Sequence, residues 1–84
     1  MTTPPNNSFG FDSVQNAALS QLEEALAEDA QGCIGHTRKT NNKRRVWACY
    51  LRVLELKLAD ALTTNERTAA RDAGAWLGEK EPAA

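Results

Sequence analysis

Cysteine and histidine are the side chains here that most readily bind a metal ion. Cys33 and His36 lie close together, and Cys49 follows them along the chain. A structural zinc site needs four ligands, and no other Cys or His exists, so a carboxylate or a second chain would have to supply the fourth. We therefore predict no metal and no cofactor, with both cysteines as reduced thiols.

No arrangement typical of an enzyme active site accompanies these residues. His36 is the single histidine, and no serine or cysteine beside it forms a recognisable nucleophile motif. A glycine-rich phosphate loop is also absent from the sequence. The sequence predicts a protein that is not an enzyme.

Basic side chains crowd the middle of the chain, although its formal net charge is −1. Residues 1–33 contain five acids and no base, whereas residues 34–57 contain seven bases and one acid. Such density is typical of nucleic-acid contacts, which we predict from Arg38, Lys39, Lys43, Arg44 and Arg45. The interleaved neutral donors would add hydrogen bonds to a phosphate backbone; they are Thr37, Thr40, Asn41 and Asn42.

The same cluster also has a purely structural interpretation. Acids stand near the end of the first predicted helix and bases at the start of the second, and the helix dipole disfavours both placements. An antiparallel hairpin would let each group offset the other, and exposed pairs of this kind need no further function. It would bring one of Glu24, Glu28 and Asp29 near one of Lys43, Arg44 and Arg45.

Residues 58–77 resemble the helix-turn-helix of bacterial and phage DNA-binding proteins. The likeness covers LADAL, a three-residue turn and ERTAARDA. Ala59 stands where the family packs an alanine between its two helices, and Ala69 and Ala73 stand where apolar residues hold the second helix. The chain differs at the turn, where Thr63 replaces the usual glycine and Thr64 a β-branched apolar residue.

The resemblance implies that the second helix of this motif reads base edges in the major groove. Its exposed positions would be Glu66, Arg67, Thr68, Ala70 and Arg71. Among these, the resemblance assigns nucleic-acid contacts to Arg67, Thr68 and Arg71.

Apolar spacing predicts the helices that carry these groups. The first begins at Asp12 or Ser13, both good N-caps, and ends near Gly32. Its predicted stripe comprises Val14, Ala18, Leu22, Ala25 and Asp29. The stretch HTRKTNNKRR follows as a loop or short irregular hairpin, because consecutive asparagines favour a turn.

The second helix is predicted over residues 43–62. Its stripe, at spacings of three and four, comprises Trp47, Leu51, Leu54, Leu58 and Leu62. The β-branched and aromatic residues of RRVWACYLRVLEL also suit a strand, but the leucine spacing favours helix.

The third helix is predicted from Thr64 to Leu77. Thr63 and Glu66 have the form of a capping box, and Gly78 ends the helix. Gly74 weakens its middle or lets another backbone approach. The helix should bury Ala69, Ala73, Trp76 and Leu77. The largest buried side chains are expected to be Leu22, Leu26, Leu51, Leu54, Leu58 and Trp76.

These elements predict an all-α fold, a small three-helix bundle with a basic inter-helix loop. Residues 1–10 should form a flexible arm, 11–78 one domain and 79–84 a polar tail. With no apolar run that could span a membrane and no signal peptide, we expect a cytoplasmic protein that does not bind membranes.

We expect a nucleic-acid-binding protein of bacterial or phage type, a regulator or DNA-packaging accessory. The alternative is an inhibitor or adaptor that docks on a larger host protein, because aromatic and arginine side chains dominate such interfaces. A chain of 84 residues buries a limited core, which is also compatible with a homodimer.

Overall fold

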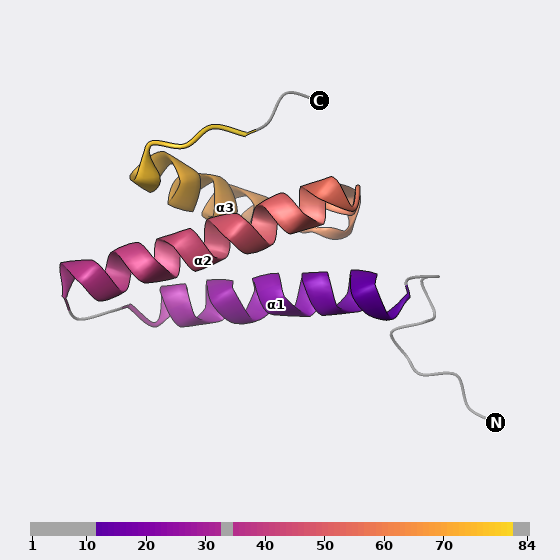
Figure 1. Ribbon diagram of the computed structural model, residues 1–84, viewed down its shortest axis with the longest axis horizontal. Coiled ribbons are helices and arrows are strands. Elements are labelled where there is room, and N and C mark those ends of the chain that lie inside the picture. The colour runs from indigo at the N-terminus through magenta and orange to yellow at the C-terminus, as the bar shows by residue number, and fades with distance from the viewer. Residues whose placement is uncertain (1–11, 33–34, 82–84) are drawn as a thin grey trace.

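A computed structural model describes residues 12–32 and 35–81; the predicted arm and Cys33 lie outside the described residues. It contains α1 (Ser13–Ala30), α2 (His36–Glu55), the short 3-10 turn η2 (Ala59–Ala61) and α3 (Thr64–Leu77). The helix α2 lies between α1 and α3 and packs against both, whereas α1 and α3 barely touch (Figure 1). The prediction of an all-α three-helix bundle is confirmed.

The first helix begins and ends close to where its sequence predicts. The carboxylate of Asp12 accepts a hydrogen bond from the backbone N–H of Gln15, and the Gln15 side chain accepts one from the N–H of Asp12. This capping box satisfies backbone donors that the first turn leaves without partners. At the other end, Gly32 adopts a positive φ of 81°, which stops α1 and turns the chain toward α2.

The predicted basic loop is wrong, because residues 36–45 form the first half of α2. The consecutive asparagines favour a turn locally, but contacts with α1 outweigh that preference. Two basic side chains of this segment form ion pairs with the end of α1, and the hydroxyl of Thr40 donates to the carbonyl of His36 within the helix (3.0 Å). The segment thus continues the helix that buries Val46 and Trp47.

The end of α2 also differs from the prediction, at Glu55 instead of Leu62. Lys57 adopts a left-handed conformation with φ 61°, and its N–H bonds to the carbonyl of Leu54. The N–H of Leu58 bonds to the carbonyl of Val53, which completes a Schellman motif. Burial of the Leu58 side chain accompanies this turn, so tertiary packing holds a lysine where a glycine is usual.

The third helix is confirmed at both ends. The hydroxyl of Thr63 accepts from the N–H of Glu66, and the Glu66 carboxylate accepts from the N–H of Thr63 at 2.7 Å. Gly78 ends the helix with φ 77°. The LADAL segment before it is a 3-10 turn, not the end of a long α-helix.

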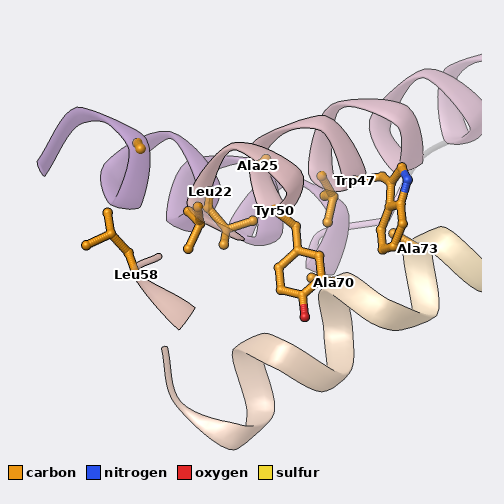
Figure 2. Packing of buried hydrophobic residues seen from close by; sticks show 10 residues of the cluster. Leu22, Ala25, Trp47, Tyr50, Leu58, Ala70 and Ala73 are labelled. Atoms are coloured by element: carbon orange, nitrogen blue, oxygen red, sulfur yellow. The ribbon is translucent and has the colours of Figure 1, made fainter. Parts of the chain in front are cut away.

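The core sits between large side chains of α2 and small side chains of α1 and α3 (Figure 2). Its α2 members are Val46, Trp47, Tyr50 and Val53. Its other members are Ala18, Leu22, Ala25, Leu58, Ala70 and Ala73. Alanines on the outer helices let both approach α2 closely, so the central helix supplies most of the buried volume.

Several burial predictions change with the boundaries of α2. Leu22 and Leu58 are buried as predicted, whereas Trp76 remains 39% exposed and Val14 52% exposed. Ala70, expected on the exposed side of α3, is fully buried. The remaining predicted core leucines are only partly buried; they are Leu26, Leu51 and Leu54.

Candidate nucleic-acid interface

The helices α1 and α2 form the antiparallel hairpin that the charge pattern predicts. The ammonium of Lys43 lies 2.8 Å from the Asp29 carboxylate, and both side chains are mostly buried. Arg45 forms an exposed ion pair with Glu28. The pairing of acids from the end of α1 with bases of α2 is therefore confirmed.

The other three predicted cations of α2 have different surroundings. Within residues 12–32 and 35–81, Arg38 and Arg44 form no ion pair or hydrogen bond, and both are exposed. The ammonium of Lys39 lies 5.9 Å from the ring centre of Trp76, within reach of a cation–π contact. Two arginines near the start of α2 thus keep their full hydrogen-bonding capacity.

A polar face runs along the side of α2 that points away from the core. We call it the outer face of α2. Its members recur at spacings of three and four residues, and all are exposed. They are Thr37, Arg38, Asn41, Arg44, Arg45, Ala48 and Arg52.

The charged side chains of the outer face are all positive. The single acid of α2 is its last residue, Glu55, which pairs with Arg52 at 3.1 Å. Among the neutral members, Asn41 stands three residues after Arg38 and three before Arg44, and its side chain forms no hydrogen bond within the described part of the chain. An arginine-rich face of this kind suits phosphate groups, because guanidinium binds them through two parallel hydrogen bonds.

Two of the three predicted contacts on α3 form ion pairs with acids of the chain. Arg71 donates through Nε to the carboxylate of Glu81 at 3.1 Å. Arg67 lies 3.8 Å from Asp60, and its Nε is enclosed without a partner among the described residues. Thr68 is exposed. Both arginines of α3 therefore have an acidic partner in the chain, while their side chains stay partly exposed.

Glu81 also ties the chain after α3 to the central helix. The hydroxyl of Tyr50, from the core, donates to one Glu81 oxygen while Arg71 donates to the other. The hydrogen bond from Tyr50, with the attraction of Arg71, lowers the pKa of Glu81. Burial first, and then the Glu81 carboxylate, raise the pKa of Tyr50. Sequence reasoning missed this contact because a polar tail residue carries no packing signal.

His36 and Trp76 meet at the first turn of α2. Their ring centres lie 5.4 Å apart with the planes inclined at 39°. Trp76 therefore reaches from the last turn of α3 to the first turn of α2, which explains its partial exposure. The sequence prediction buried it with the core instead.

A shallow hollow lies between α2 and α3, with a volume of about 260 Å³. It is lined by Arg44, Trp47, Ala48, Leu51, Leu77 and Glu79. Trp47, Ala48, Leu51 and Leu77 supply apolar lining, and Arg44 and Glu79 supply the charged groups.

Metal chemistry finds no support in the described residues. No three Cys, His, Asp or Glu side chains gather there in a way that would hold an ion. Burial raises the pKa of the Cys49 thiol, which keeps it protonated and weakly reactive near neutral pH. Cys33 is outside the described residues, so the three-ligand set of the sequence cannot be placed.

No helix within the described ranges combines the length and apolar character needed to cross a bilayer. The chain matches no protein-family model, no curated protein and no solved structure. The arrangement of side chains therefore carries the functional argument.

Proposed function

We propose that this protein binds nucleic acid through the outer face of α2. The observation that carries the proposal is that Arg38 and Arg44 are exposed and form no ion pair with any described residue, on a helix face with no acid before its last turn. Phosphate contacts from such arginines release condensed counterions, which supplies most of the binding free energy at low salt. Arg45 and Arg52 add to the field because exposed ion pairs exchange partners at little cost.

The residues that we propose to contact nucleic acid differ from those that the sequence predicts. Lys43 is held in a mostly buried ion pair, and Arg67 and Arg71 face acids of their own chain. Lys39 lies toward Trp76. We propose that phosphate contacts come from the arginines of α2, in a DNA-associated regulator or packaging accessory.

The test is a fluorescence-anisotropy titration of labelled oligonucleotides at several salt concentrations. The double variant Arg38→Gln, Arg44→Gln should bind more weakly and lower the slope of log K against log salt by about one unit for each arginine. Lys57→Gln is the control, because it removes one exposed charge beyond the end of the outer face. Failure of the native protein to bind DNA or RNA even at low salt contradicts the proposal.

One observation favours a second function, that of an inhibitor or adaptor for a larger protein. The lining of the hollow between α2 and α3 combines apolar side chains with the charged Arg44 and Glu79, a composition that suits an inserted side chain. Under this alternative, Leu77→Glu should abolish capture of the partner while Arg38→Gln leaves it unchanged. Pull-down from the native host with nuclease treatment separates the two functions.

A further inference from the structure

We infer that the nucleic acid is duplex DNA, that α2 enters its major groove, and that Asn41 reads base edges there. The inference rests on the proposed function and adds to it the class of ligand and the residue that determines specificity. It also assigns base reading to α2, whereas the helix-turn-helix resemblance assigns it to α3.

The shape of the outer face favours the major groove of B-form DNA. From Thr37 to Arg52 the face is a regular helix of roughly 22 Å, given a rise of 1.5 Å per residue. The B-DNA major groove is about 12 Å wide and accepts an α-helix. The major groove of A-form RNA is deep and narrow, so a helix face cannot reach its base edges.

The composition of the outer face disfavours single strands. Proteins that hold single-stranded nucleic acid combine basic grooves with aromatic rings on which bases stack. No member of the outer face is aromatic. The exposed ring of Trp76 packs with His36 and Lys39, neither of which is a member of the outer face. A strand lying along the outer face would therefore find phosphate partners but no stacking platform.

Asn41 has the position and the chemistry for base reading. It lies in the middle of the basic half of the outer face, with Arg38 one turn before it and Arg44 and Arg45 one turn after it. With α2 in a groove, these arginines reach toward the phosphates while the central amide faces the floor. An asparagine amide pairs with adenine through two hydrogen bonds, one to N6 and one to N7. Asn41 also lines an open hollow with Thr37 and Arg38, so its amide is accessible.

The arginines of α3 have acidic partners within the chain, as Arg45 and Arg52 of the outer face also do. Base reading by Arg67 or Arg71 would require each to leave an acid of its own chain, Asp60 or Glu81. Leaving Glu81 would also remove one of the two groups that hold this carboxylate beside Tyr50. Among the described residues Arg38, Asn41 and Arg44 have no such partner, so these three can reach DNA without a rearrangement.

The first arm of the experiment compares ligands of one sequence as duplex DNA, duplex RNA and single-stranded DNA, with the native protein. We expect the tightest binding to duplex DNA. Stronger binding to single-stranded DNA or to duplex RNA overturns the inference and leaves the proposed function intact. No binding to any of the three contradicts the proposed function itself.

The second arm selects preferred sites from a randomised duplex library and repeats the selection with variants. Asn41→Ala should reduce discrimination at one base-pair position by about tenfold while leaving the salt slope unchanged, because a base contact carries sequence information and a phosphate contact does not. Asn65→Ala, an exposed asparagine on α3, is the matched control and should leave discrimination unchanged.

A third variant, Thr68→Ala, tests reading by α3. Loss of discrimination in Thr68→Ala but not in Asn41→Ala would show that α3 is the reading helix and would overturn the inference. All three substituted positions are exposed and helical, so melting curves should confirm that each variant folds. If Asn41→Ala discriminates between base pairs as well as the native protein does, Asn41 does not read bases, even if the variant still binds DNA.

Discussion

The indole ring of Trp47 lies directly on the Cα atom of Gly74, where α3 crosses α2. A Cβ atom added at Gly74 would stand 2.5 Å from Cζ3 of that ring, far inside van der Waals contact. Gly74 is therefore required by packing in the middle of a helix, where glycine is otherwise unfavourable. The sequence suggested a close approach at this residue, and the group that approaches is a side chain instead of a backbone.

Gly74→Ala should destabilise the protein by up to about 2 kcal/mol. Overpacking typically costs about 1–3 kcal/mol, and the better helix propensity of alanine recovers about 1 kcal/mol. Urea unfolding measures the difference. In the Trp47→Leu background the same substitution should become neutral or stabilising, because the shorter side chain leaves room for Cβ. A more stable Gly74→Ala variant with Trp47 in place would contradict this account of the contact.

The contact between Glu81 and Tyr50 predicts a dependence of stability on pH. The pKa of Glu81 is lowered in the folded protein, so its contribution is complete above the unfolded value of about 4.3 and is lost as pH falls through the folded pKa. Native protein should thus exceed Glu81→Gln in stability at pH 6, and the gap should close as pH falls below about 4.3 and through the lowered folded pKa. Denaturant unfolding at several pH values measures it. Glu79→Gln, an exposed acid beside the tail, should show no such gap.

Lys57 predicts a stabilising substitution. A left-handed conformation costs a residue with a Cβ about 1–2 kcal/mol, and glycine does not incur it. Lys57→Gly should therefore raise the stability by about 0.5–1 kcal/mol after the entropy of the unfolded glycine is counted. Thermal melting checks the sign. Ala48→Gly, at an exposed position inside α2, should instead lower stability by about 1 kcal/mol.

The sequence predicts the helix ends best where the caps are local. Asp12, Thr63 and Gly78 carry their signals in neighbouring residues, and the structure confirms each of them. The two ends of α2 depend on distant groups instead. Residues 36–45 are helical with the acids of α1 beside them, and Lys57 turns the chain because Leu58 enters the core. Neither of these long-range contacts can be predicted from the helix or turn preferences of the neighbouring residues.

In the candidate site, too, some features can be predicted from neighbouring residues and others depend on the folded helix. The basic residues are plain in the sequence, and Asp29 with Lys43 is one of the acid–base pairs that the predicted hairpin allows. The outer face could not be derived while residues 36–42 were assigned to a loop, because a face exists only once the helix is continuous. With the helix boundary corrected, Arg38, Asn41 and Arg44 fall into one register.

Two ion pairs join α1 to α2. Removing the acid of one pair should change stability more, and removing the acid of the other should change DNA affinity more. Asp29 and Lys43 are mostly buried, so Asp29→Asn leaves a poorly solvated ammonium without its partner and should cost about 1–3 kcal/mol. Glu28 and Arg45 are exposed, so Glu28→Gln should cost at most about 1 kcal/mol, and less at high salt. Each variant removes one acid, which equalises their long-range effect on a polyanion.

The difference in DNA affinity then reports which cation is released. Glu28→Gln frees Arg45 on the outer face, whereas Asp29→Asn frees Lys43 on the side toward α1. If the outer face binds DNA, Glu28→Gln should raise affinity more than Asp29→Asn, although it perturbs stability less. Anisotropy titrations and urea unfolding on the same two variants measure both effects. An equal or larger gain in affinity for Asp29→Asn would place the phosphate contacts away from the outer face.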